Sequence, residues 1–196
     1  MGQSDVPHDK RAAYGVKLKE NGYLGMKIRI ANPVPLEDVV AARVIKVAVG
    51  DDFELMVDRT ADLAGRVWDY DIGLKVARGM QEAGVYWLEE PFGHTHADDI
   101  KHARLAASVD IPITGGEWDQ GIERFAGYLA NDVFDIVQPD GAIVGGILNS
   151  RKVGTLAKGF GKRCILHGTN SLGSAGFLQA CGALLWHELP DLLQAK

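Results

Sequence analysis

Short stretches rich in β-branched and aromatic residues alternate along the chain with stretches whose apolar residues recur at helical spacing. The β-rich stretches begin near Met26, Leu55, Val85, Ile111, Asp135 and Cys164. Apolar residues with a helical period lie between them, as in Leu36, Val39, Val40, Val44 and Val47, and in Ile122, Phe125, Ala126 and Leu129. Alternation of this kind predicts parallel strands joined by helices.

Helix boundaries are marked by glycine and proline. Gly50, Gly84 and Gly161 stand where predicted helices should end, and Pro35 begins a helix. A further helix is expected over residues 10–20, before the first strand. We therefore divide the chain into residues 1–24, an N-terminal segment with a helix, and residues 25–196, which hold the strand–helix repeats.

Functional residues favour a closed barrel over an open, doubly wound sheet. A nucleotide-binding sheet carries a glycine-rich turn after its first strand, but Ala31-Asn32-Pro33 follows the strand that begins at Met26. Polar residues at the ends of several strands are typical of a (β/α) TIM-type barrel. A full barrel takes about 250 residues, and the chain has 196, so we expect an incomplete barrel that lacks its first strand. A last strand is possible over Leu184–Glu188.

Composition excludes several classes of protein. A net charge of −5, with scattered Lys and Arg, argues against nucleic-acid binding. Neither a membrane-spanning apolar run nor a signal peptide is visible, so we expect a cytoplasmic protein without a membrane partner. Cys164 and Cys181 lie in apolar stretches without paired spacing, which favours buried free thiols.

Three acids end three successive predicted strands: Asp58, Glu89 and Glu117. Carboxylates brought together at one barrel mouth repel one another by about 4 kcal/mol per pair at 4 Å and an effective dielectric of about 20. A bound cation removes that repulsion, and oxygen-only ligation selects Mg²⁺, with Mn²⁺ as a second possibility. The alternative is that each acid separately caps a helix or faces solvent.

Cations and an imidazole are expected at the same mouth. Lys27 and Arg29 lie two residues apart in a strand, so both project to the face opposite Met26 and Ile28, although a solvated edge strand would show the same spacing. Asp140 and His167 end two later strands. An Asp bonded to one ring nitrogen increases the basicity of the other, which predicts a proton-abstracting pair; a lone strand-end His is more often structural.

Motifs in this order resemble the mandelate racemase and muconate lactonizing group of the enolase superfamily. They are Lys27-x-Arg29, Val57-Asp58, Glu89-Glu90-Pro91, Gly116-Glu117, Gln138-Pro139-Asp140, Gly145-Gly146 and His167-Gly168. The resemblance implies a C-terminal barrel domain in which Asp58, Glu89 and Glu117 ligate the metal and Asp140 and His167 form the base dyad of the mandelate racemase branch. It also implies that Glu188 hydrogen-bonds the reaction intermediate.

Two departures from the family pattern affect the expected chemistry. The family often has a second lysine where Arg29 stands, and a guanidinium orients a carboxylate but hardly abstracts a proton. The family's N-terminal capping domain, which supplies specificity loops, has no counterpart in the sequence.

His94 and His96 follow the Glu89 motif and either touch substrate or are solvated loop histidines, the second being favoured.

The resemblance, together with these departures, implies a lyase: a Mg²⁺-dependent dehydratase of an aldonic or aldaric sugar acid. His167 takes the proton α to the carboxylate, Lys27 and Arg29 hold that carboxylate, and the β-hydroxyl then leaves. The runner-up is an isomerase, a racemase or epimerase that uses Lys27 as its second base. A third possibility is an inactive barrel remnant with a structural role. We expect self-association, because an incomplete barrel exposes strand edges.

Overall fold

The structure is a computed structural model that describes residues 6–60 and 67–168. Six helices and six strands alternate along these residues. In chain order they are α1 (His8–Glu20), β1 (Gly25–Arg29), α2 (Pro35–Val49), β2 (Glu54–Asp58), α3 (Tyr70–Glu82), β3 (Trp87–Glu89), α4 (His96–Ala106), β4 (Ile113–Gly115), α5 (Ile122–Ala130), β5 (Ile136–Val137), α6 (Ile147–Gly159) and β6 (Arg163–Cys164). The alternation predicted from the sequence is confirmed, and each strand begins within two residues of its expected position.

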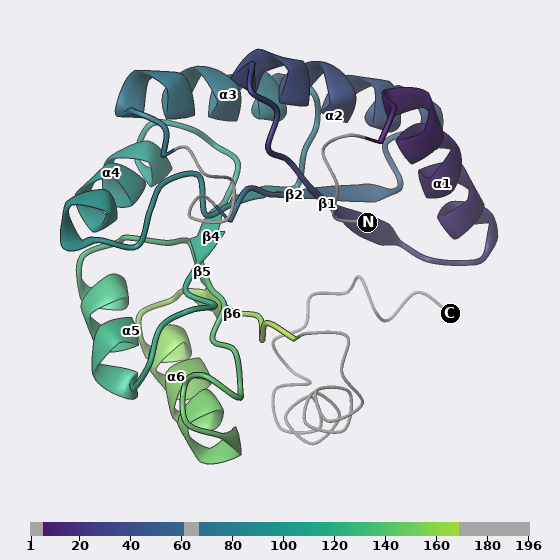
Figure 1. Cartoon of the computed structure of the whole chain (residues 1–196). Helices are drawn as coiled ribbons and strands as arrows, with labels where there is room; N and C mark the ends of the chain where they lie inside the picture. Colours follow the sequence, from purple (N-terminus) through teal and green to yellow (C-terminus); the bar gives the residue numbers. More distant parts are fainter. Residues whose placement is uncertain (1–5, 61–66, 169–196) are drawn as a thin grey trace. The chain divides into compact units, whose positions relative to one another are not determined.

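The chain divides into two compact units, residues 1–113 and 114–196. In the first unit, β1, β2 and β3 are parallel neighbours in that order, and the Leu88 amide donates to the Pro112 carbonyl just before β4. α1 contacts β1 and α2, and α2 contacts α3 (Figure 1). In the second unit, β4, β5 and β6 are parallel neighbours, and α5 contacts α6. Each unit is thus a row of parallel strands with helices, as in an α/β fold.

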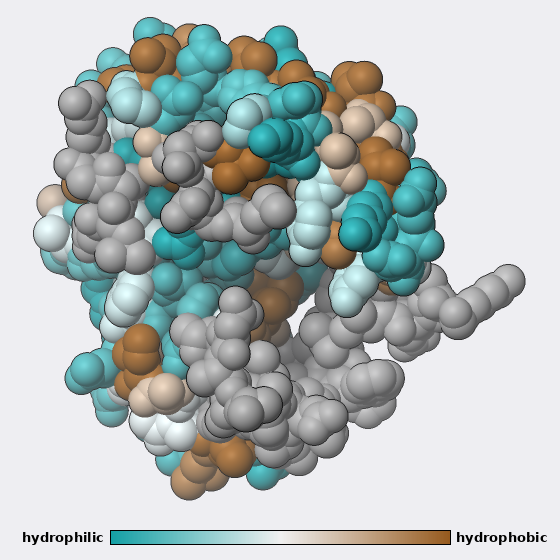
Figure 2. All heavy atoms as spheres, turned by 45° about the vertical axis from the view of Figure 1, so that its right-hand side comes forward, coloured by the Kyte–Doolittle hydropathy of each residue, from teal (hydrophilic) through white to brown (hydrophobic). Residues whose placement is uncertain are grey.

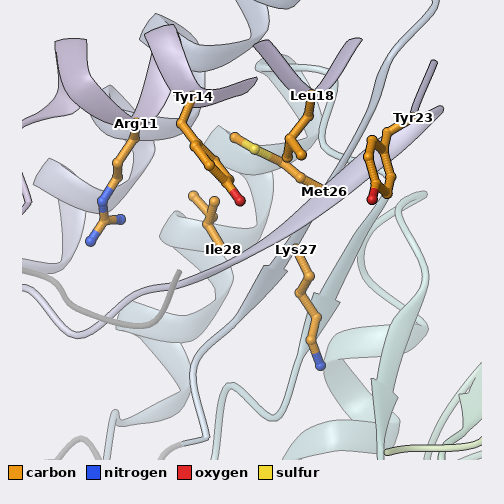
Figure 3. A pocket seen from close by; sticks show the side chains of 8 residues that line it. Arg11, Tyr14, Leu18, Tyr23, Met26, Lys27 and Ile28 are labelled. Atoms are coloured by element: carbon orange, nitrogen blue, oxygen red, sulfur yellow. The ribbon is translucent and has the colours of Figure 1, made fainter. Parts of the chain in front are cut away.

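Strand alternation separates an apolar from a polar face in the first unit. Ile28, Leu55 and Val57 are buried, and each fully buried aliphatic side chain contributes about 1.5–3 kcal/mol. Lys27 projects from β1 to the side opposite Met26 and Ile28, as Figure 3 shows. A pocket of about 300 Å³ is lined by residues of α1, of β1 and of the segment between them, and Figure 3 shows the side chains that line it.

The helix ends have identifiable causes. α2 begins at Pro35 and is followed by Gly50 at φ 80°, a conformation that favours glycine. Asp69 caps α3 through its side chain, which accepts from the Ile72 amide, and Thr95 forms a capping box at the start of α4. The described helices include none that is both long and apolar enough to cross a membrane.

α2 turns a different face inward from the one that its valines suggested. Val40, Val44 and Val47 are exposed, as is Leu36, whereas Val39 and Ile45 are buried. Because α2 carries apolar residues on most of its circumference, the period alone does not select the buried side. Figure 2 shows hydrophobic and hydrophilic residues interspersed on the face in view.

Candidate functional site: strand-end acids and an Asp–His pair

The first unit aligns charged residues at the carboxyl ends of its strands. Arg29 is the register partner of Asp58, and Asp58 is the register partner of Glu89. Residues in register on adjacent parallel strands project to the same face. The three side chains therefore belong to one row, and Lys27 lies two residues before Arg29 on the same face.

Both acids of this row are buried against cations. Asp58 is 1 % exposed and Glu89 is 0 % exposed. The Lys27 Nζ lies 2.7 and 2.8 Å from the two carboxylate oxygens of Glu89 and 3.4 Å from Oδ2 of Asp58, and Arg29 donates to the same Oδ2 at 2.9 Å. Buried carboxylates require such partners, since an unpaired buried charge is strongly unfavourable. Lys27 and Arg29 are thus part of a charge network, which excludes the solvated edge-strand alternative.

Neighbouring side chains fix the orientation of the two carboxylates. The Thr60 hydroxyl donates to Oδ1 of Asp58 at 2.6 Å, and the Trp87 indole N–H donates to Oε2 of Glu89 at 3.2 Å. Supporting hydrogen bonds of this kind hold ligating groups in place. Neither Thr60 nor Trp87 was anticipated from the sequence, because nothing in the pattern of a Thr or a Trp near a strand end distinguishes a supporting donor from a packing residue.

The second unit brings Glu117, Asp140 and His167 together. His167 Nδ1 lies 2.9 Å from Oδ2 of Asp140, and Nε2 lies 3.0 Å from Oε2 of Glu117. The Nδ1 contact is a hydrogen bond, whereas the Nε2 contact is an ion pair when the ring is protonated. Glu117 and Asp140 are buried, and His167 is half-buried. The imidazole therefore lies between two carboxylates.

Backbone contacts hold the Asp140–His167 pair rigidly. The two residues form a parallel β-bridge, and the His167 amide donates to the Pro139 carbonyl at 3.1 Å. The other oxygen of Asp140, Oδ1, accepts from the Ala142 amide at 2.8 Å. With one oxygen fixed by the backbone, Asp140 presents the other to His167. This arrangement orients the ring, as a carboxylate does for a catalytic histidine.

The helix-capping alternative for the three acids does not hold. The N-cap residue of the helix that follows each acid is another residue: Asp69 for α3, Thr95 for α4 and Gly121 for α5.

Of the other predicted site residues, Glu188 lies outside the described part of the chain, as do Cys181 and the possible strand 184–188. Cys164 is buried, as expected.

Residues 10–191 match the family model described as "Enolase C-terminal domain-like". The match covers most of the chain, so the protein belongs to the enolase C-terminal domain-like family. The parallel β/α arrangement and the strand-end acids agree with that assignment, and the fold is that of an enolase-superfamily barrel.

Similar proteins act on sugar acids. An L-talarate/galactarate dehydratase of Salmonella typhimurium is 35 % identical over 163 residues, covering 83 % of this chain and 39 % of that protein. A 3,6-anhydro-alpha-L-galactonate cycloisomerase of Streptomyces coelicolor is 29 % identical, covering 77 % and 40 %. The L-talarate dehydratase of Polaromonas sp. JS666, solved with Mg and L-glucarate, matches with a TM-score of 0.77 at 26 % identity, covering 88 % of this chain and 46 % of that one. The chain therefore spans about two fifths of the length of the Salmonella and Streptomyces relatives.

Proposed function

We propose that the protein is a Mg²⁺-dependent dehydratase that removes the α-proton of an aldonic or aldaric acid and expels its β-hydroxyl. One observation carries the proposal: His167 is held by Asp140 at 2.9 Å in the same unit as the acid Glu117. A fixed imidazole beside a carboxylate is suited to proton abstraction. The dehydratases among the similar proteins support the choice of reaction and substrate class.

The residues present fit a hard divalent cation. Asp58, Glu89 and Glu117 are buried carboxylates that follow or end three successive strands, and carboxylate oxygens are the ligands that Mg²⁺ prefers. We assign these three residues as the ligands. The ion supplies, when bound, positive charge that stabilises the enediolate form of the substrate. The similar structure from Polaromonas, which contains Mg, supports this assignment.

Lys27 and Arg29 have a positioning role in the proposal. In the structure they bind Glu89 and Asp58, respectively. A substrate carboxylate carries the same charge as these acids, so the two cations can also hold that group close to the ligands. Arg29 remains protonated at neutral pH and serves no proton transfer. His167 then removes the α-proton.

Proton exchange tests the role of His167. Wild-type protein with Mg²⁺ and a panel of aldaric and aldonic acids in deuterated water should incorporate deuterium at the α-carbon. His167→Asn and Asp140→Asn should lower the exchange rate by at least about 100-fold, the usual size of a general-base contribution. Asp135→Asn is the matched control, because Asp135 lies just before β5 and pairs with Lys162 instead. Undiminished exchange in His167→Asn would remove this residue from the mechanism.

An isomerase is the second candidate, favoured by the similar cycloisomerase and by Lys27 as a possible second base. The two reactions differ in their products. Deuterium exchange without loss of water would indicate racemisation or epimerisation, whereas formation of a 2-keto-3-deoxy acid indicates dehydration. Because Lys27 lies within hydrogen-bond distance of both Glu89 oxygens, we favour a binding role for it and therefore dehydration.

A further inference from the structure

Another carboxylate–imidazole pair follows β3. His94 Nε2 lies 3.5 Å from Oε2 of Glu90, and the two side chains are 20 % and 1 % exposed. The pair begins one residue after Glu89, so it lies at the carboxyl end of β3, the same strand end that carries the proposed metal ligand. His94 is therefore neither a solvated loop residue nor part of the chemistry assigned so far.

The loop that carries His94 is fixed on both sides. Before it, Phe92 is fully buried, and its amide donates to Nε2 of His102 at 3.3 Å. After it, Thr95 forms the capping box of α4. A loop anchored so close to a side chain restricts where that side chain can go. His94 is thus held in place before any substrate binds, which catalytic groups require.

Backbone strain at Glu90 supports a functional reason for this arrangement. Glu90 has φ 46°, in the left-handed region that residues other than glycine rarely adopt. Backbone conformations of this kind cluster at functional sites. This residue directly follows Glu89, and its carboxylate is the one that lies 3.5 Å from His94.

The proposed dehydration requires an acid as well as a base. His167 retains the α-proton that it removes, and a hydroxyl group leaves readily only when it is protonated. Lys27 and Arg29 are engaged by carboxylates in the first unit. We propose that His94, oriented by Glu90, is the general acid that protonates the departing β-hydroxyl; this inference rests on the proposed function.

Protons and electrons balance over the reaction. The α-C–H bond breaks and its proton passes to His167. The electron pair forms a carbon–carbon double bond as the β-C–O bond breaks. His94 gives a proton to the departing oxygen, which leaves as water, and the resulting enol tautomerises to the 2-keto acid. His94 is reprotonated from solvent, and His167 releases its proton to solvent.

Separating exchange from elimination tests this role. For each variant, deuterium incorporation at the α-carbon and 2-keto-3-deoxy product are measured with Mg²⁺ and the same panel of sugar acids. His94→Gln should lower product formation by about 10²–10⁴-fold, the range for a general acid, while α-proton exchange continues. Glu90→Gln should have a smaller effect in the same direction.

A matched control and a rescue substrate sharpen the test. His96→Gln should react at the wild-type rate, because His96 is 90 % exposed and pairs with Asp99. A substrate analogue with fluoride in place of the β-hydroxyl needs less proton assistance to eliminate, so it should react at similar rates with wild type and His94→Gln.

Three results overturn the role of His94. They are elimination of water by His94→Gln at the wild-type rate, an equal loss of exchange and elimination in that variant, and failure of the fluoro analogue to rescue it. Each of these leaves the wild-type reaction, and so the proposed function, intact. Absence of both exchange and product in the wild type contradicts the proposed function itself, and the role of His94 falls with it.

Discussion

Asp38 is a buried carboxylate whose replacement should stabilise the protein at neutral pH. It lies in the first turn of α2, is 4 % exposed, and accepts a hydrogen bond from the Asn32 amide at 3.1 Å. Burial raises the pKa of Asp38 from 3.8 to about 6, although that hydrogen bond and the charges of Arg59 and Arg11 act in the opposite direction. The cost of burying the charge therefore exceeds the attraction of its partners.

The pKa difference sets the size and the pH range of the effect. Each pKa unit corresponds to about 1.4 kcal/mol, so ionised Asp38 destabilises the folded state by about 3 kcal/mol relative to its protonated form. The folded protein holds this proton up to pH of about 6, whereas the unfolded chain loses it near 3.8. The stabilisation from the proton is fully present below pH 3.8 and is lost as the pH rises through about 6.

Asp38→Asn removes this penalty while its amide oxygen can still accept from Asn32. Urea unfolding followed by circular dichroism should show a free energy of unfolding about 3 kcal/mol above wild type at pH 7, and less than about 1 kcal/mol above it near pH 4. Asp52→Asn is the control. Asp52 is exposed, and its hydrogen bond with Lys19 lowers its pKa, so the replacement should bring no gain at pH 7. An Asp38→Asn protein no more stable than wild type at pH 7 would refute the argument from burial.

Three further predictions concern packing, titration and capping. Gly73→Ala would place a Cβ 2.5 Å from two ring carbons of the buried Phe92, so thermal unfolding should show a free energy of unfolding lower by about 1–3 kcal/mol. In the control Gly127→Ala the new Cβ meets no atom within 4 Å, so the free energy of unfolding should rise by up to about 1 kcal/mol. Burial, the largest cause, lowers the pKa of His102 to about 3. The NMR signal of the His102 ring should stay constant from pH 8 to 5, and a signal that titrates near 6.5 would contradict this. Because the histidine of the unfolded chain binds a proton near pH 6.5, the contribution of His102 to stability is lost as the pH falls below that value. Thr95→Ala removes the capping box of α4 and should cost about 1 kcal/mol of unfolding free energy, an expectation that equal melting temperatures would exclude.

The order of elements and the row of charged strand ends were predictable from local rules. Strand alternation is enough to place Lys27 and Arg29 on one face, and the carboxyl ends of successive parallel strands are enough to expect Asp58 and Glu89 to be neighbours. Both expectations are confirmed in the first unit. The pairing of Asp140 with His167 is confirmed in the second, 27 residues apart in sequence.

Features that depend on side-chain packing were not predictable. The buried face of α2 is one example, since Val40 and Val39 are equally apolar and only the tertiary structure buries Val39. His94 is another example, because the sequence does not show whether a loop histidine near a glutamate is solvated or paired with it. Thr60, which donates to Asp58, has φ 42°, a conformation that sequence patterns do not indicate for threonine.

Calorimetric titration with Mg²⁺ tests most directly the central claim that Asp58, Glu89 and Glu117 hold one ion. Wild type should bind one Mg²⁺ per chain, and both Asp58→Asn and Glu117→Gln should weaken binding by at least about tenfold, since even residues that only support ligands change metal affinity by 10–100-fold. Glu123→Gln, an exposed acid in α5, should bind as wild type does. Equal affinity in wild type and Glu117→Gln, or no binding by wild type, would contradict the account.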